Sequence, residues 1–377
     1  MPRLLAVLML QFAVGAAPAL AQTTGSELPD IGTPASTTLS LADEYKIGLM
    51  IVRGLREAGQ IVEDPEINEY LQSLGMRLAS QAHEGAHRFT FFAVRDSSIN
   101  AFALPGGFIG VQAGLVKATR SEAELAGVLA HEIAHVTQRH IARSIQNAGR
   151  ANMASLAAML AAILLGATTG VPADAVLGGV TAAQGLAAQS QINYTRANEA
   201  EADRVGIGIL SAAGFDPVGM PEFFGTMQQR MGGAGRNIPD LLRTHPVTIE
   251  RIAETRDRAS RMERPRTPDS TSYALIRDRL QLETVSEESR VLDMFPAAKS
   301  ADYPSTDAEQ YGRALALMRA GSATEAIVAL EALRDRRPDV TLFHTALGQA
   351  QLAAGYRSRI AASVVAASSS RRSRMSA

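Results

Sequence analysis

The sequence predicts an α+β fold that is mainly helical, with a small mixed sheet and with helical hairpins in its C-terminal third. Three observations support this prediction. Aromatic residues make up only 5% of the 377-residue chain and tryptophan is absent, which favours Ala/Leu-rich helices over a β-sandwich. Residues 87–94 are rich in aromatic and β-forming residues, as a strand is. The spacing of 34 residues between Ala320-Gly321 and Ala354-Gly355 is typical of repeated helix pairs.

The composition is that of an ordinary folded protein, with 46% hydrophobic and 20% charged residues. The chain is long enough for two domains, or for one large domain with an extension. Its net charge of -1 argues against a general nucleic-acid-binding protein, so no nucleic acid is expected as a partner. The absence of cysteine excludes a disulfide scaffold, a Cys-type zinc finger and a thiol nucleophile.

Residues 1–21 predict a signal peptide. Arg3 supplies the positive charge, an apolar run follows, and an Ala-Leu-Ala cleavage signal ends at Ala21. We therefore expect export to the periplasm with cleavage after Ala21. Residues 22–39 are rich in Ser, Thr, Gly and Pro, which predicts a flexible mature N-terminus.

Two helices are predicted next. Apolar residues recur at helical spacing from Ser40 to Gln60. Asp64 and Pro65 then begin a second helix that runs towards Leu78. We expect both helices to pack over the catalytic unit described below.

The sheet is predicted from the strand at 87–94 and from the segment 100–111. Within that segment Pro105 cannot donate to a strand ladder, so it suits a sheet edge or the turn that ends one. An edge strand can pair with an extended peptide through main-chain hydrogen bonds. A plain hairpin fits the spacing equally well.

The helix that follows carries the sequence His-Glu-Ile-Ala-His. Ser121 and Glu124 predict a capping box at its start. His131 and His135 are four residues apart, so both imidazoles face one point and can hold a zinc ion. Glu132 lies close enough to take a proton from water there. The alternative is a pair of histidines that merely sit on a partly buried helix.

This helix is expected to run on to about Ile145. His140 would then lie roughly 140° round from His135, pointing away from the metal as a surface residue. Peptidases with the H-E-x-x-H-x-x-G-x-x-H arrangement need a glycine and a third histidine where this chain has Gln138 and Ile141, so that class is excluded.

A third zinc ligand is expected from the segment 198–203. Glu199 and Asp203 lie on one helical face, where Glu199 can ligate and Asp203 can accept the N–H of a ligating histidine. Glu201 lies about 200° round from Glu199 and cannot share that role. The alternative is a solvated acidic helix start. The helix is expected to stop at Gly214.

Residues 151–168 are strongly apolar, but the uninterrupted run is shorter than the ~20 residues that a membrane span needs. A buried or amphipathic helix is therefore favoured over a span, and peripheral membrane contact through residues 151–189 stays open.

Residues 124–140 and 198–204 together resemble the gluzincin metallopeptidases, the family that includes HtpX and the CAAX prenyl endopeptidase. The resemblance covers roughly residues 40–355. It implies a zincin-type metallopeptidase domain over residues 40–262 with one Zn²⁺ per chain. In this family the matching positions bind zinc through His131, His135 and Glu199 and use Glu132 as the general base.

Two further segments match the family. The segment Asn-Ala-Phe-Ala-Leu-Pro-Gly-Gly resembles one that lies beside the family's cleft, which favours the substrate strand over the plain hairpin. The candidate substrate-binding residues are Asn100, Ala101, Phe102 and Ala103. Thr-His-Pro at 244–246, with Arg251 following, matches a third motif and makes Arg251 a candidate supporting residue. His245 can either hydrogen-bond the oxyanion of the tetrahedral intermediate or occupy the open zinc position and keep the enzyme latent.

The C-terminal part is predicted in three pieces. Residues 263–305 form a linker with a helix, and residues 306–355 form tetratricopeptide-like repeats. About one and a half repeats are present, and fewer than three are rarely stable alone, so we expect them to pack against the preceding domain. Residues 356–377 form a basic Ser/Arg-rich tail where a repeat helix is expected.

The export signal and the repeats make the chain most similar to a periplasmic member of the family. That resemblance implies a zinc endopeptidase that hydrolyses misfolded or misassembled envelope proteins, especially those of the outer membrane. It also implies the outer-membrane protein assembly machinery as a partner. The alternative is a repeat-bearing chaperone or assembly factor whose peptidase site is mostly latent.

Overall fold

The computed structural model describes residues 40–82, 88–148, 185–233, 239–265, 268–285, 291–296 and 306–355. The predicted signal peptide, the segment 22–39, the apolar run 151–168 and the tail 356–377 lie outside these residues. The elements in chain order are α2 (Leu41–Glu57), α3 (Pro65–Ala79), β1 (Thr90–Val94), β2 (Ala101–Leu104), β3 (Phe108–Gln112), α4 (Ala113–Ala118), α5 (Glu122–Thr137), α6 (His140–Ala148), α9 (Gly185–Ala212), α10 (Gly219–Gly233), α11 (Asp240–Thr244), α12 (Ile249–Ser260), α13 (Thr271–Glu283), α14 (Val291–Met294), α15 (Asp307–Arg319) and α16 (Ala323–Arg336). A further helix covers 341–355. The predicted mainly helical α+β class is confirmed.

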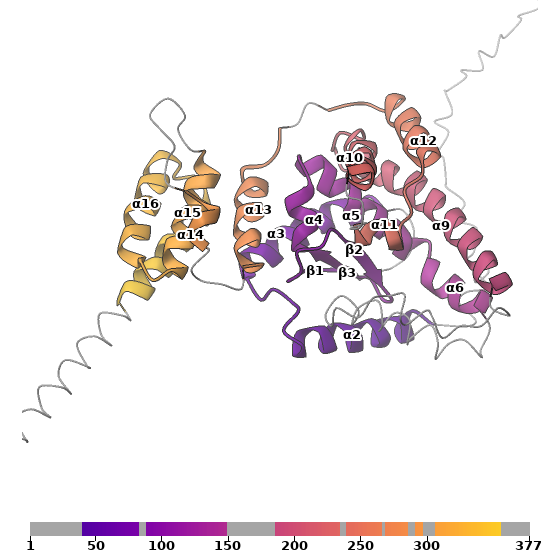
Figure 1. Ribbon diagram of the computed structural model, residues 1–377, viewed down its shortest axis with the longest axis horizontal. Helices are drawn as coiled ribbons and strands as arrows, with labels where there is room; N and C mark the ends of the chain where they lie inside the picture. The colour runs from indigo at the N-terminus through magenta and orange to yellow at the C-terminus, as the bar shows by residue number, and fades with distance from the viewer. Residues whose placement is uncertain are drawn as a thin grey trace, which may run out of the picture.

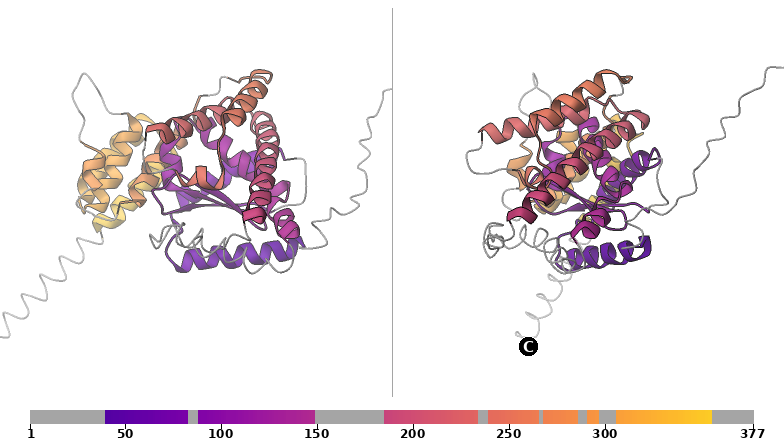
Figure 2. Two further views of the ribbon diagram at one scale, coloured as in Figure 1. Left: turned by 45° about the vertical axis from the view of Figure 1, so that its right-hand side comes forward. Right: turned by 90° about the vertical axis from the view of Figure 1, so that its right-hand side faces the viewer.

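The three strands form one mixed sheet in the order β1-β3-β2. β1 runs parallel to β3, and β2 runs antiparallel to it with Ala101 opposite Val111. α2 lies along one face of the sheet, and α3 and α5 cover the other (Figure 1; Figure 2). The alternation of strand side chains explains this layering, because Phe92 joins the apolar cluster under α2 while Phe91 joins the main core.

β2 and β3 are joined by the tight turn 105–107. Gly106 and Gly107 have φ of 80° and 84°, backbone angles that residues other than glycine rarely adopt. A Cβ on Gly107 would also lie 1.9 Å from the carbonyl oxygen of Arg88. The segment is therefore a hairpin, and in the described part of the chain its first strand is also an outer strand of the sheet.

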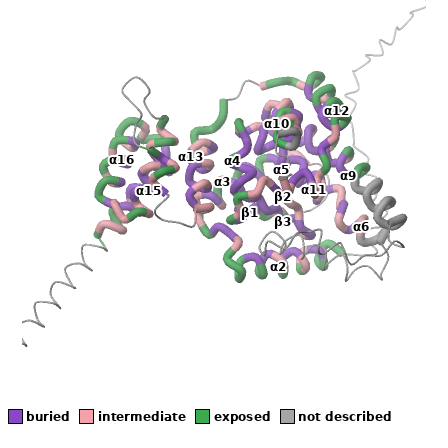
Figure 3. The backbone as a smooth tube through the Cα atoms, viewed as in Figure 1, coloured by how far each residue is buried: buried purple, intermediate pink, exposed green. Residues whose placement is uncertain are grey.

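α5 is the central helix, and almost all of its length is buried (Figure 3). Ser121 caps it, since its Oγ accepts from the backbone N–H of Glu124 at 3.2 Å. The carboxylate of Glu124 instead accepts from the N–H of Arg120 at 2.7 Å, so only the first half of the predicted capping box forms at this helix start. α9 packs closely on α5, and a Cβ on Gly206 would lie 3.0 Å from the carbonyl oxygen of Ala130. This close approach brings the carboxylates of α9 to the histidines of α5.

The expectation that this helix continues to Ile145 is wrong. α5 ends at Thr137, and Arg139 has a φ of 51°, so the chain turns before α6 begins at His140. The Arg139 side chain pairs with the buried Glu44 of α2, whose Oε1 accepts from Arg139 Nε at 3.1 Å. A tertiary ion pair thus accompanies a backbone conformation that local sequence does not favour.

α13 connects the central body to the C-terminal helices. It contacts α3 and α4 on one side and α15 on the other (Figure 1). Arg279 donates to the carboxylate of Asp64 at 2.8 Å and to the hydroxyl of Tyr311 at 2.8 Å. α15 and α16 pack as a helical hairpin, and Phe343 of the next helix contacts Tyr311 with ring centroids 5.7 Å apart. The main core therefore runs without interruption into these helices.

Within the described ranges, no helix has both the length and the apolar character needed to cross a membrane. The apolar run 151–168, on which that question was raised, lies outside those ranges.

Candidate active site

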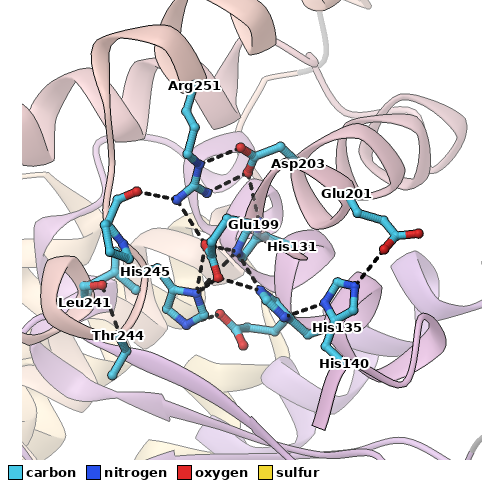
Figure 4. A network of polar contacts seen from close by, with 12 residues as sticks. His131, His135, His140, Glu199, Glu201, Asp203, Leu241, Thr244, His245 and Arg251 are labelled. Atoms are coloured by element: carbon cyan, nitrogen blue, oxygen red, sulfur yellow. Dashed lines mark hydrogen bonds and ion pairs between the residues drawn. The ribbon is translucent and has the colours of Figure 1, made fainter. Parts of the chain in front are cut away.

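The predicted site residues come together where α5, α9 and the segment joining α11 to α12 meet (Figure 4). α5 supplies His131 and His135, and α9 supplies Glu199. His245 follows the last residue of α11. The four side chains form a group whose nitrogen and oxygen atoms all lie within 4.8 Å of one another, so they can hold a metal ion.

The four facing atoms have the spacing of a small coordination shell. Nε2 of His131 lies 3.0 Å from Nε2 of His135 and 3.3 Å from a carboxylate oxygen of Glu199. Nε2 of His135 lies 3.3 Å from the other oxygen of Glu199. Nδ1 of His245 lies 3.4 Å from Nε2 of His131 and 3.0 Å from Glu199. Ligand atoms about 2.1 Å from a tetrahedral ion are roughly 3.4 Å apart, so the donor set fits such an ion.

Glu132 lies beside this group, as predicted. Its side chain is 1% exposed, and neither carboxylate oxygen has a hydrogen-bond partner among the described residues. Nε2 of His245 lies 3.5 Å from Oε1 of Glu132. A buried carboxylate without a protein donor is costly, so it favours a site that a water or a substrate group completes.

Asp203 and Arg251 lie behind the group, as the sequence predicts. Oδ1 of Asp203 is 3.0 Å from Nδ1 of His131, the ring nitrogen that faces away from the other ligands. The Arg251 guanidinium donates to both oxygens of Asp203, at 2.7 and 2.8 Å, and lies 2.9 Å from Glu199. Arg251 therefore joins the two carboxylates of α9 and fixes how His131 is presented.

The electrostatics favour positive charge at this point. Burial opposes protonation of His131, but hydrogen bonds to Asp203 and Glu199 raise the pKa of His131 to about 10. Burial also opposes ionisation of Glu199, but His245 and hydrogen bonds from the two α5 histidines lower its pKa well below the ordinary value. Glu199 is therefore a buried carboxylate that stays ionised, which is a state that a bound cation stabilises.

The expectation that His140 is a surface residue facing away from the site is wrong. His140 is 3% exposed, and its Nδ1 lies 2.8 Å from Nδ1 of His135 (Figure 4). Burial and the neighbouring His135 lower the pKa of His140 to about 4. Helical geometry failed here because the helix breaks at Arg139, and no sequence signal marks that break. Glu201 contacts His140 and does not join the donor group beside Glu199. That agrees with its predicted position on the helix, about 200° round from Glu199.

The candidate substrate segment lies next to α5. Its last three residues, Ala101, Phe102 and Ala103, belong to the outer strand β2, which contacts α5. Asn100 is buried, and its Oδ1 accepts from the hydroxyl of Thr244 at 3.4 Å. Thr244 immediately precedes His245, so the strand and the histidine are linked.

The fold and the donor set together define a metallopeptidase. Residues 65–259 match the model of peptidase family M48, about half of the chain. The putative beta-barrel assembly-enhancing protease of Vibrio cholerae is 39% identical over 88% of this chain and 68% of its own length. The beta-barrel assembly-enhancing protease of Escherichia coli is 36% identical over 89% of this chain and 68% of its own length.

A more distant relative is the mitochondrial metalloendopeptidase OMA1 of Arabidopsis thaliana, 28% identical over 50% of this chain and 35% of its own length. These matches settle the family. The chain belongs to peptidase family M48, and it is a metalloendopeptidase.

Proposed function

We propose that the chain is a zinc endopeptidase that hydrolyses misfolded or misassembled outer-membrane proteins in the periplasm. The observation that carries the catalytic part is the unpaired Glu132 carboxylate beside four converging donor atoms. Support for the substrate class comes from the relatives named for enhancing β-barrel assembly.

Zinc fits the donor set better than other common ions. His131 and His135 offer imidazole nitrogens and Glu199 one carboxylate, whereas magnesium and calcium prefer oxygen ligands throughout. Zinc held there would supply Lewis acidity and make the attacking water more acidic. Glu132 then acts as general base, taking the proton of the attacking water and passing it to the leaving amine. Asp203 and Arg251 hold His131 in the required orientation.

His245 keeps the site closed in this arrangement. Its Nδ1 takes the fourth place around the donor group, and its Nε2 faces Glu132. It thereby occupies the space in which water and the scissile carbonyl would meet the base. Of the two roles expected for His245, this geometry favours the blocking ligand over the oxyanion donor. His245 begins the irregular segment 245–248 between α11 and α12, so a local shift there would open the site.

The remaining assignments follow the same proposal. Residues 40–262 form the peptidase domain, and 263–305 join it to an incomplete tetratricopeptide-like unit at 306–355. The outer strand β2 binds an extended substrate through main-chain hydrogen bonds. The helical hairpin α15–α16 contacts envelope substrates or the outer-membrane assembly machinery. The signal peptide 1–21 directs export.

Metal removal tests the proposed function. We expect that an unfolded outer-membrane β-barrel protein is cleaved by the full chain as purified, and that a zinc chelator abolishes the cleavage. Zinc added in slight excess should restore it, whereas magnesium should not, because the donor set includes two imidazoles. Gel-based cleavage assays and metal analysis measure the two effects. Cleavage that persists in protein stripped of metal would contradict the proposal.

Replacing His245 tests the closed state. His245→Ala should raise peptidase activity while weakening zinc binding about 10-fold or more, because the fourth donor is lost. Cleavage rates and chelator competition measure the two effects. An oxyanion role predicts the opposite for activity, a loss of about 10²–10³ in kcat. If neither activity nor zinc occupancy changed, His245 would have no part in the site.

A further inference from the structure

A second set of side chains lies behind His135. Nδ1 of His135 is 2.8 Å from Nδ1 of His140. Nε2 of His140 is 3.2 Å from a carboxylate oxygen of Glu201, and Arg143 donates to the same oxygen at 2.8 Å (Figure 4). Three of these residues come from α5 and α6 and one from α9, so the set crosses the helix interface.

The positions of the protons in this series of hydrogen bonds follow from the direction that the His135 ring faces. Its Nε2 points at the donor group, 3.0 Å from His131, and must be unprotonated to bind a cation. Its proton is then on Nδ1, and Nδ1 of His140 must accept it. The proton of His140 is therefore on Nε2, where the Glu201 carboxylate accepts it. Each ring N–H in the series then has an acceptor, and each hydrogen bond can run in only one direction, from His135 to His140 and from His140 to Glu201.

We propose that His140 and Glu201 are positioning residues for the metal site. They fix the tautomer and the ring orientation of His135, so that its Nε2 is always the ligand atom. This inference rests on the proposed function, because it concerns the same metal. It adds a role for two residues whose positions in the helical pattern pointed away from the site.

The two ligand histidines are then supported in parallel ways. His131 is backed by a carboxylate that an arginine holds, namely Asp203 with Arg251. His135 is backed by Glu201 with Arg143, and the imidazole of His140 spans the extra distance between ring and carboxylate. Ligand histidines usually donate their second N–H to such a partner, and losing the partner typically weakens metal binding by 10–100-fold.

Two substitutions at one position distinguish positioning from packing. His140→Leu fills the same buried space but cannot accept from His135, so zinc affinity should fall by about 10–100-fold. His140→Gln offers an amide oxygen to His135 and an amide N–H to Glu201, so it should stay within about threefold of the wild type. Chelator competition on the full chain measures the affinities. The visible absorption of the Co²⁺-loaded protein reports the ligand geometry, and it should change for His140→Leu only.

Two further variants control for folding and for the loss of any histidine. Glu201→Leu changes a residue whose side chain is 26% exposed, so it should fold and show a smaller loss of zinc affinity. His344→Leu removes an exposed histidine of the C-terminal helix and should change neither the affinity nor the spectrum. Thermal unfolding of the metal-free proteins identifies any variant that fails to fold.

The inference is wrong if His140→Leu and Glu201→Leu bind zinc like the wild type, or if His140→Gln binds as weakly as His140→Leu. Zinc affinity and the Co²⁺ spectrum are measured separately from peptide cleavage, so a failure of this inference can be distinguished from a failure of the proposed function. If the wild type and His245→Ala both bound zinc but cleaved nothing, the proposed peptidase would be wrong and the positioning role would be intact. A wild type that binds no zinc would contradict both.

Discussion

Glu132→Gln should lower the rate of peptide hydrolysis by about 10²–10⁴-fold while leaving zinc binding close to that of the wild type. The substitution keeps the shape of a buried side chain but removes the base that takes the proton from water. Zinc binding is preserved because Glu132 is not among the four residues whose donor atoms converge. Cleavage of an unfolded β-barrel protein and metal content after dialysis measure the two effects.

The same variant separates the peptidase from the chaperone alternative. In cells that lack the endogenous protein, Glu132→Gln should fail to restore assembly of outer-membrane proteins if hydrolysis is the function. Rescue equal to that of the wild type would favour the repeat-bearing chaperone. Normal cleavage by purified Glu132→Gln would refute the assigned base. Glu254→Gln is the matched control, because it alters a carboxylate that is 53% exposed and lies outside the site.

Arg251→Gln should lower the free energy of unfolding of the metal-free protein by about 3–5 kcal/mol. Arg251 is the guanidinium that pairs with both Asp203 and Glu199, and all three side chains are less than 10% exposed. Without it, the two buried carboxylates of α9 lose the guanidinium that pairs with both of them. Urea unfolding followed by circular dichroism measures the loss. Added zinc should recover part of it, because the ion places positive charge beside Glu199.

Arg258→Gln is the matched control for this prediction. It removes an arginine from the same helix, α12, but its partner Glu254 is 53% exposed and Arg258 itself 37% exposed. Exposed pairs contribute roughly 0–1 kcal/mol, so little change is expected. Equal stabilities for the two variants would mean that the Arg251 network adds nothing to folding.

Much of the site could be predicted from local sequence because its chemistry is arranged on helical spacing. Residues four apart on one helix place His131 beside His135, and the same rule places Asp203 one turn after Glu199. The helix start at Asp64 and Pro65 is equally local, since the Asp64 side chain accepts from the N–H groups of the first turn.

What sequence could not supply depends on contacts between distant segments. The break at Arg139 accompanies an ion pair with Glu44, 95 residues earlier, and it turns His140 towards His135. The position of α13 depends similarly on Arg279, which contacts Asp64 215 residues away. Helical periodicity assumes that a helix continues until a local signal ends it, so it missed the break at Arg139. It also carries no information on which distant elements a helix packs against, so it could not place α13.

The Arg279 junction has a consequence for how the molecule denatures. α13 is covered by α3 and α4 on one side and by α15 on the other. The guanidinium of its residue Arg279 donates to Asp64 on the first side and to Tyr311 on the second. Separating the C-terminal helices would leave Arg279 and the apolar face of α13 exposed to water, together with Tyr311. We therefore expect the hairpin α15–α16 to show no melting transition of its own. It should lose its structure in the same cooperative step as α5, the helix that carries the histidines.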